Sequence, residues 1–447
     1  MHVAKAIWGL MRKFEKEGLD IQTLGKKNLQ DRVEFLGKSY SIGATAYEED
    51  KSAAEDIKEI NFLVYKAAQE VVLPSFSEKP RVNYDQYISG KKYDYKNIKE
   101  LYTEGRGWSL EYFESIYKRL GMHFDGYYPE SRTGEFGYEM VLEGLKKGIF
   151  ERGKEDAIIF PGEKYGLHNR VFINAMNLPT YEAKDFGNAV AKSKDFPYDK
   201  SVIVTGNEID EYFVVVLKAL SLYDKKLSDA TTHIGHGMVR LPEGKMSSRT
   251  GKIVRGEWVL DEAKKRVHKI VEKSDALKSS PDSKKEETAE EIAQAAVKYA
   301  FLKQGVGKNI AFDFDASLSF EGNSGPYLQY TYARARSVLE KADPKDAKAY
   351  DFSVLKQKIN KDELLILRLM MHFPEVVAEA TERYSPNLIC SYLFNLAQRF
   401  NNLYSKYRIA DERDDDSRSF RVNLTAATAQ VIKNGLNLLG IGSPESM

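Results

Sequence analysis

The sequence has little of several features that would point to particular classes of protein. A single cysteine, Cys390, excludes an internal disulfide and a zinc site built from several cysteines, and it favours a reducing cytoplasm. No apolar run approaches the roughly twenty residues that a membrane-spanning helix needs. Lys+Arg 67 balance Asp+Glu 66, so only local basic patches could bind a nucleic acid.

The features that are present are typical of a globular protein of two or three domains. Of the 447 residues, 42% are hydrophobic and 30% are charged, which is enough to bury more than one core. Tyrosine is abundant, with 27 residues. We expect most tyrosines to be half-buried in cores, and some to be available for stacking on nucleic-acid bases.

Residues 1–275 show strand-like runs alternating with amphipathic helical patterns. Apolar residues from Val3 to Phe14 share one helix face, and similar patterns cover 53–72, 110–120 and 208–222. The strand-like runs are 157–160, 170–173, 201–205 and 233–241. This alternation predicts an α/β domain with a parallel, doubly wound (Rossmann-type) sheet, whose ligands bind beyond the carboxyl ends of the strands.

Beyond residue 275 the pattern is almost wholly helical. A polar segment, Lys278–Glu287, is predicted to be an exposed loop, and a charged loop covers Asp411–Arg418. The predicted helices are 289–302, 326–341, 361–373, 388–407 and 424–439. We expect a connecting helical segment over 276–320 and an all-α helical bundle over 321–447.

The stretch Gly244–Gly251, with Lys252 after it, combines glycines, hydroxyls and cations between a strand and a helix. Glycines let the backbone bend, N–H groups can cradle oxygens, and a lysine supplies a movable charge. These properties suit a chain of phosphates, although a solvated basic turn has the same composition.

The string His233-Ile-Gly-His236 matches one of the two signatures of class I aminoacyl-tRNA synthetases, the one that binds ATP after the first strand of the sheet. Here it lies nine positions before Lys245, on the strand that leads into the candidate phosphate loop. The two signatures belong to opposite halves of the sheet, so we expect structural or edge roles for both histidines.

Three stretches together resemble the arginyl-tRNA synthetase family, and the resemblance runs across essentially the whole chain. Gly237–Gly251 looks like the region of the family's lysine signature, and Glu321–Arg336 is similar to the opening of its anticodon-binding domain. Gly435–Met447 looks like its C-terminus. The resemblance implies ATP-dependent activation of L-arginine to arginyl-adenylate and transfer to the terminal ribose of tRNA(Arg).

The resemblance assigns roles to residues of the candidate phosphate loop. It implies that Lys245 neutralises the β- and γ-phosphates as pyrophosphate leaves, assisted by Ser247 and Arg249, with Mg²⁺ arriving on ATP and no metal site built by the protein. The residues implied to bind ATP are Gly206, Glu208, Met238, Val239, Lys245, Met246 and Ser248.

Pro179–Asp185 looks like the family's site for the arginine side chain. Tyr181 and Asp185 are four apart and would share a helix face, where a carboxylate can pair with a guanidinium; a helix N-terminus with an exposed acid remains the alternative. The family commonly has glutamine and histidine where this chain has Ile209 and Tyr212, which puts one polar contact in doubt, although Glu208 could replace it.

Aromatic and basic residues of the second domain are candidates for binding tRNA, because splayed bases stack on aromatic rings and arginines meet phosphates. The candidates are Tyr327, Tyr330, Arg334, Tyr404 and Met447. Tyr327 and Tyr330 are three apart on one helical face, and we expect one of them to be a core residue.

In the family, the histidine signature and the first strand of the sheet come before the helix that matches the start of this chain. We therefore expect an N-terminally incomplete synthetase. Two alternatives remain: a non-catalytic tRNA-binding remnant, or one half of a split enzyme whose partner chain carries the missing part.

Overall fold

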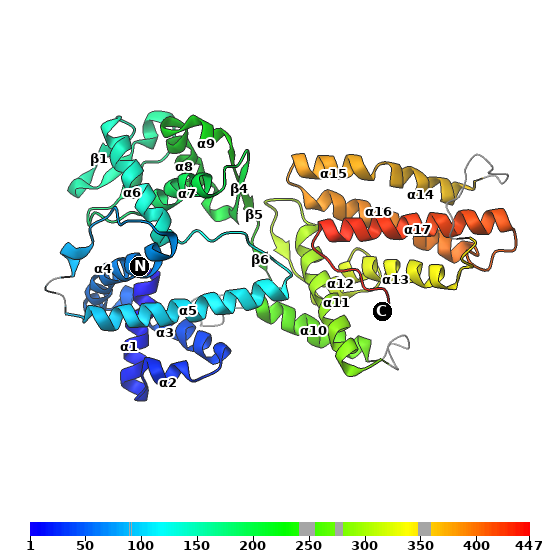
Figure 1. The fold of residues 1–447 in the computed structure, drawn as a ribbon, viewed down its shortest axis with the longest axis horizontal. Helices are drawn as coiled ribbons and strands as arrows, with labels where there is room; N and C mark the ends of the chain where they lie inside the picture. The colour runs from blue at the N-terminus through cyan, green and yellow to red at the C-terminus, as the bar shows by residue number, and fades with distance from the viewer. Residues whose placement is uncertain (89, 91, 241–254, 273–279, 347–358) are drawn as a thin grey trace. The chain divides into compact units, whose positions relative to one another are not determined.

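A computed structural model describes the chain except for residues 89, 91, 241–254, 273–279 and 347–358 (Figure 1). The chain divides into two compact units, Met1–Ile234 and Gly235–Met447. The domain limits predicted at residues 275 and 320 both fall within the second unit and stay a prediction.

The first unit consists mainly of helices, several of which begin at an Asp or Asn side chain that accepts a backbone N–H. Its helices are α1 (His2–Glu17), α2 (Ile21–Gly25), α3 (Leu29–Glu49), α4 (Lys51–Val72), α5 (Tyr95–Arg119), α6 (Glu130–Lys146), α7 (Tyr181–Asp195), α8 (Asp210–Tyr223) and α9 (Lys225–Asp229). The helical patterns predicted over 3–14, 53–72, 110–120 and 208–222 are confirmed, because α1, α4, α5 and α8 cover them almost completely.

Glycines allow α6 and α7 to pack backbone against backbone. A Cβ added at Gly137 on α6 would overlap the carbonyl of Ala183 on α7. A Cβ at Gly187 on α7 would overlap the carbonyl of Thr133 in return. Because α7 carries Tyr181 and Asp185, this close crossing positions the candidate arginine site.

We expect Gly137→Ala to lower the free energy of unfolding of the first unit by about 3 kcal/mol, since the new methyl must push two helices apart. Gly107→Ala on α5 is the matched control, because nothing lies within 4 Å of a Cβ built there. Urea unfolding followed by circular dichroism measures both variants. Equal stability of the two would contradict the close crossing.

The β4–β5 pair is a parallel pair joined by helices, as the sequence predicts for this part of the chain. β4 (Ser201–Gly206) and β5 (Thr231–His236) are joined through α8 and α9. The N–H of Ser201 donates to the carbonyl of Ala230 at 2.8 Å, and Thr205 Oγ1 lies 2.7 Å from the Nε2 of His233. Residue numbers increase together in these two contacts, from 201 and 230 to 205 and 233, so the two strands run in the same direction. Parallel neighbours need a crossover connection of this kind.

The strand-like runs at 157–160 and 170–173 are strands but do not belong to a parallel sheet. β1 (Glu151–Arg152), β2 (Ile158–Phe160) and β3 (Arg170–Ile173) form a separate antiparallel sheet in the order β1-β2-β3. The connection between β2 and β3 contains only a 3-10 turn, which suffices for antiparallel neighbours but not for a parallel crossover.

The single strand predicted over 233–241 is two strands in the structure. β5 ends at His236, and β6 (Val239–Arg240) pairs in parallel with β7 (Ile310–Ala311). Between them lies Gly237, where a Cβ would overlap the carbonyl of Lys308. The chain therefore changes sheets at a glycine that no larger residue could replace.

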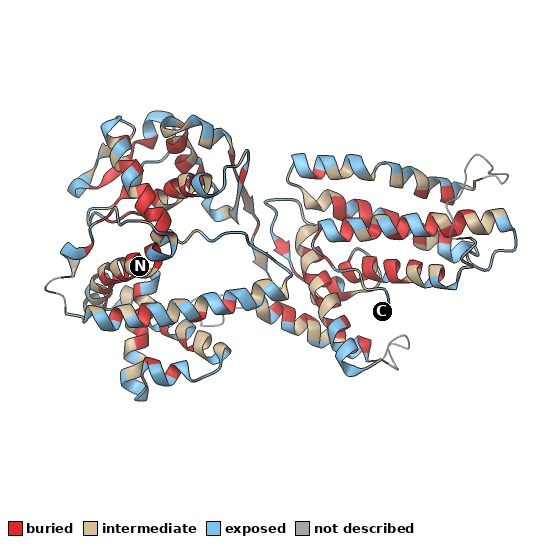
Figure 2. Ribbon diagram, in the orientation of Figure 1, coloured by how far each residue is buried: buried red, intermediate tan, exposed pale blue. Residues whose placement is uncertain are grey.

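In the residues that the structure describes, the regular elements of the second unit are helices apart from β6, β7 and the end of β5. Its helices are α10 (Gly256–Val271), α11 (Asp282–Leu302), α12 (Phe314–Leu318), α13 (Gly325–Lys341), α14 (Lys361–Met371), α15 (Phe373–Glu382), α16 (Pro386–Lys406) and α17 (Asp415–Leu438). Figure 2 shows buried residues along α13, α16 and α17 where these helices face one another.

Two segments predicted as loops are partly helical. α11 begins at Asp282, inside the predicted loop Lys278–Glu287, and α17 begins at Asp415, inside the charged loop Asp411–Arg418. Both helices start with acidic residues, which the positive end of the helix dipole stabilises. The composition that suggested a solvated loop is in fact that of a helix N-terminus.

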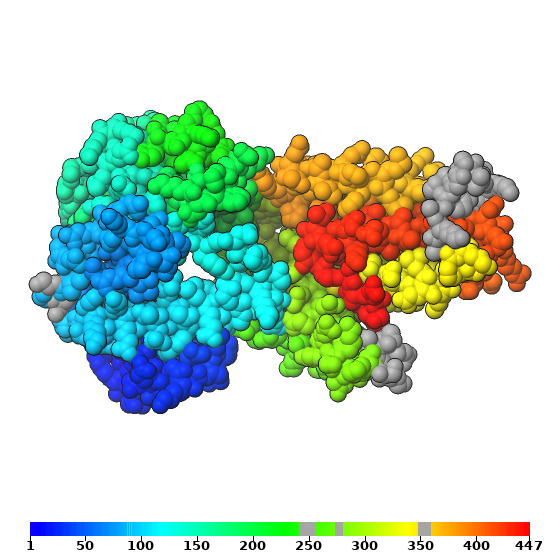
Figure 3. Space-filling view, viewed as in Figure 1, coloured from blue at the N-terminus to red at the C-terminus, as the bar shows by residue number. Residues whose placement is uncertain are grey.

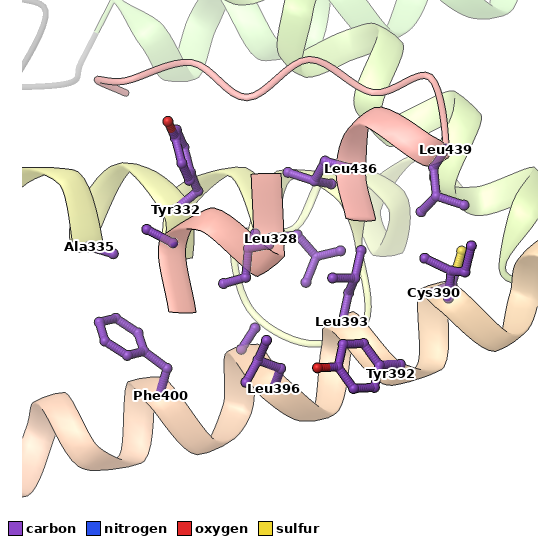
Figure 4. Close-up of a cluster of buried hydrophobic side chains, with 14 of the residues drawn as sticks. Leu328, Tyr332, Ala335, Cys390, Tyr392, Leu393, Leu396, Phe400, Leu436 and Leu439 are labelled. Carbon is purple, nitrogen blue, oxygen red and sulfur yellow. The ribbon is translucent and has the colours of Figure 1, made fainter. Parts of the chain in front are cut away.

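The second unit is called the helical unit below, and its core is formed by α11, α13, α14, α15, α16 and α17. Figure 4 shows Leu328, Leu393 and Phe400 among the side chains that meet there, all fully buried. Cys390 belongs to this core, and burial raises the pKa of its thiol to about 12. The thiol is thus a packing group, as expected for a cysteine in an apolar environment.

Candidate functional site

Tyr181 is the first residue of α7, and its half-exposed side chain lines a cavity of about 640 Å³ in the first unit. The cavity is mostly apolar and lies among α1, α4, α5, α6 and α7. Glu130 and Lys184, which also line it, form an ion pair at 2.8 Å. Asp185 is not among the lining residues.

Asp185 is directed instead toward the first turn of α8. Its Oδ2 accepts a hydrogen bond from the hydroxyl of Tyr212 at 2.6 Å. Burial raises the pKa of Asp185, and the hydrogen bond from Tyr212 opposes that rise. Helix spacing placed Tyr181 and Asp185 on one helix, as predicted, but their side chains contact different elements.

Gly206 and Glu208, assigned to ATP, lie where β4 ends and the next helix begins. The carboxylate of Glu208 folds over Gly206 so closely that a Cβ at position 206 would overlap it. The overlapping atoms are the far end of a flexible side chain that can turn away, so this packing does not itself require glycine. Glu208 lies at the strand end where a ligand would approach.

Met238 and Val239, also assigned to ATP, lie at β6 in the second unit. The N–H of Met238 donates to Asn309 Oδ1 at 2.9 Å, and its carbonyl accepts from the N–H of Ile310 at 2.9 Å. Both backbone groups of Met238 are thus engaged within the protein. The half-exposed side chain of Met238 is the part that stays accessible.

The residues of the candidate phosphate loop lie outside the described part of the chain. They are Lys245, Met246, Ser247, Ser248 and Arg249. Their segment connects β6 to α10, so the chain position predicted from the sequence, between a strand and a helix, is retained. Their catalytic and ATP-binding roles stay predictions.

His233 is a packing residue of β5. Its ring stacks on Phe213 with centroids 4.1 Å apart, and Thr205 binds it from β4. Burial lowers the pKa of His233, which favours the neutral ring. His236 is exposed at the end of the same strand.

The helical unit brings four of the five predicted tRNA-binding residues together. Tyr330, Arg334, Tyr404 and Met447 all line one cavity of about 580 Å³. The guanidinium of Arg334 lies over both rings, 4.6 Å from the centroid of Tyr330 and 5.0 Å from that of Tyr404. Figure 3 shows the end of the chain, in red, against the yellow segment that contains α13, and the lining of the cavity includes Met447.

Tyr327 is the tyrosine that belongs to the core. It is half-buried against the main cluster, its ring lies 5.7 Å from Phe394, and its hydroxyl accepts from Asn401 at 3.0 Å. The Oδ1 of Asn401 also accepts a hydrogen bond from Arg334 at 2.5 Å. Tyr327 is therefore linked through Asn401 to a residue that lines the cavity.

Two cations at this cavity were missed by the sequence reasoning. Arg408 and Lys341 line it, from the turn after α16 and from the end of α13. Arg408 directly follows Tyr407, whereas Lys341 has no aromatic neighbour in sequence, and the packing of α16 against α13 brings the two to the same place. The tyrosine-rich run before Arg408 could have identified that residue, but no local pattern points to Lys341.

Neither a membrane span nor a metal centre is found in the described residues. No helix among them is both long and apolar enough to cross a membrane. No group of three or more His, Cys, Asp or Glu side chains in the described ranges could hold a metal ion.

Comparison with known proteins identifies the class and then the family. Residues 51–314 match the model described as tRNA synthetases class I (R), catalytic domain, and residues 328–447 match the DALR anticodon binding domain. The arginine–tRNA ligase of Clostridium acetobutylicum is 30% identical over 444 residues, covering 98% of this chain and 75% of that protein. The chain belongs to the arginine–tRNA ligase family.

Other relatives have the same family name, and they show how much of a relative's length this chain covers. The arginine–tRNA ligase of Flavobacterium psychrophilum is 34% identical over 352 residues, covering 78% of this chain and 58% of that protein. The chain thus spans less than two thirds of the length of such relatives. Thermus thermophilus arginyl-tRNA synthetase shares the fold, with a TM-score of 0.72 and 23% identity over 99% of this chain and 74% of that one.

Proposed function

We propose that this protein takes part in the ATP-dependent activation of L-arginine and its transfer to the 3′-terminal ribose of tRNA(Arg). Membership of the arginine–tRNA ligase family over nearly the whole chain carries this proposal. It is supported by a partly buried carboxylate on α7 and by an aromatic and cationic cavity in the helical unit. The cytoplasm is the compartment we assign to it.

The proposed mechanism relies on positioning and charge. Asp185 pairs with the guanidinium of arginine, and Lys245, Ser247 and Arg249 stabilise the departing pyrophosphate. Tyr181, also assigned to arginine, lines the neighbouring cavity of the first unit. We propose that Mg²⁺ enters on the phosphates of ATP, since this ion usually binds through substrate phosphates and few protein carboxylates.

Arginine-dependent exchange of labelled pyrophosphate into ATP, with tRNA(Arg) present, tests the proposal on the chain as it stands. Exchange in the isolated chain would establish activation and contradict the reading as a non-catalytic remnant. Exchange that appears only when the remaining N-terminal portion of a relative is added as a separate polypeptide would establish a split enzyme. No exchange under either condition would contradict the proposed activity.

A tRNA interaction of the helical unit is testable at Arg334. We expect Arg334→Ala to weaken tRNA(Arg) binding about tenfold, because the side chain supplies a charge and a stacking surface between two rings. Arg399→Ala is the matched control, since Arg399 is exposed on α16 and does not line the cavity. Filter binding at a fixed salt concentration measures both, and equal losses would contradict a specific role for Arg334.

A further inference from the structure

The bond between Tyr212 and Asp185 joins the start of α8 to α7 in a fixed geometry. Tyr212 is only 9% exposed, and its hydroxyl donates to Asp185 Oδ2 at 2.6 Å. One neighbour, Phe213, packs edge-on to the Tyr212 ring with centroids 5.1 Å apart, and the guanidinium of Arg170 lies 5.2 Å from the ring centre. A ring held by these contacts can direct its hydroxyl to one place.

The cations near Asp185 all donate to other groups. Lys184 binds Glu130 at 2.8 Å, Lys192 binds Ser201 Oγ at 2.6 Å, and Arg170 binds Glu182 at 3.3 Å. No cation of the described residues lies within ion-pairing distance of Asp185. The carboxylate therefore has one hydroxyl donor and no ionic partner from the part of the chain that the structure describes.

A partly buried carboxylate without a cationic partner is costly, and it is normally retained only where a ligand supplies the missing charge. Each carboxylate oxygen has two lone pairs, so the bond to Tyr212 leaves acceptor capacity on both oxygens. That arrangement suits a guanidinium, which approaches a carboxylate in its plane with two parallel N–H groups.

We propose that Tyr212 is a positioning residue that fixes the Asp185 carboxylate in the orientation that receives the guanidinium of arginine. The proposal rests on the proposed function. Ile209, three residues before Tyr212, has an apolar side chain that cannot donate a hydrogen bond. Tyr212 is therefore the residue at this strand end that supplies a hydrogen bond to the site.

The hydrogen bond also favours the ionised form of Asp185. Burial raises the pKa of this carboxyl, and the bond from Tyr212 is the largest influence that lowers it. Glu130 and Glu182 raise the pKa further, and Lys184 lowers it. Removing the hydroxyl should therefore move the titration of Asp185 to higher pH and weaken arginine binding at the low end of the pH range.

The test compares Tyr212→Phe with Tyr223→Phe in the full chain. Tyr223 is the matched control, because it ends the same helix and its hydroxyl donates to the carboxylate of Glu143 at 2.5 Å. Calorimetry with L-arginine gives the affinity. Carbon-13 NMR of labelled aspartates, assigned with Asp185→Asn, gives the titration of the carboxyl.

We expect Tyr212→Phe to bind arginine about tenfold more weakly and to raise the pH at which Asp185 titrates, while Tyr223→Phe matches the unsubstituted chain in both. Tyr212→His should recover part of the affinity, because it restores a donor. If Tyr212→Phe keeps both properties of the unsubstituted chain, the positioning role is wrong and the proposed function stands. If the unsubstituted chain binds no arginine, either alone or with the N-terminal portion of a relative added, both are wrong.

Discussion

Replacing Asp185 by asparagine should lower arginine-dependent pyrophosphate exchange by about 100- to 1,000-fold, mostly through a higher KM for arginine. The substitution keeps the size of the side chain and its bond to Tyr212 but removes the negative charge that a guanidinium requires. Loss of one partner from a desolvated, hydrogen-bonded charge pair typically costs about 2–5 kcal/mol, and each 1.4 kcal/mol is a factor of ten. The KM for ATP should change little.

The thermal stability of Asp185→Asn distinguishes a role of Asp185 in binding arginine from a purely structural role. Because burial raises the pKa of Asp185 above its value in the unfolded chain, ionisation of this carboxyl opposes folding once the pH exceeds the unfolded-state pKa. Asp185→Asn should therefore keep or raise the Tm near neutral pH while it loses activity. Asp229→Asn, at an exposed pair with Lys225, is the control. A variant that loses stability and keeps its KM for arginine would show that Asp185 is a structural residue.

Arg421→Ala should destabilise the helical unit by about 3–5 kcal/mol, because it leaves a buried carboxylate without its partner. Arg421 donates to Glu363 at 2.8 Å, to Glu412 at 2.8 Å and to the carbonyl of Arg408 at 2.9 Å. Glu363 is 1% exposed, so water cannot replace the lost guanidinium. For a unit of this size the Tm should fall by about 10 °C.

The same substitution should also affect tRNA binding. Arg421 holds the turn after α16, and residues of that turn, Arg408 to Asp411, line the cavity with Arg334. Thermal unfolding followed by circular dichroism measures the stability, and filter binding measures tRNA(Arg) affinity below the transition. Arg383→Ala, at an exposed pair with Glu379, is the control. A free energy of unfolding within about 1 kcal/mol of that control would contradict a stabilising role for the buried Arg421–Glu363 ion pair.

Much of the fold could be predicted from the sequence, because local patterns depend on local physics. Apolar periodicity identified α4, α13 and α16 to within about two residues, since a helix that packs on a core must place its apolar residues on one side. The α/β class and the helical bundle followed from the same signals, and family resemblance is confirmed over most of the chain.

The errors occurred where a local pattern has two physical meanings. Acidic runs are typical of both exposed loops and helix N-termini, and the starts of α11 and α17 were taken for loops. Strand-like runs show that a strand exists but not which strand it pairs with. The antiparallel pairing of β2 with β3 follows from the short connection between them, which a strand pattern alone does not predict.

By itself, the sequence identified the family and many of the helices, and it predicted candidate residues for binding arginine and RNA. It also placed Tyr181 and Asp185 on one helix, because four residues are about one helical turn. Only the tertiary structure decided what each side chain contacts: Tyr181 lines the cavity, Asp185 binds Tyr212, and Arg334 lies against two tyrosines. The physical reason is that helix spacing sets the direction of a side chain locally, whereas its partner comes from an element distant in the chain.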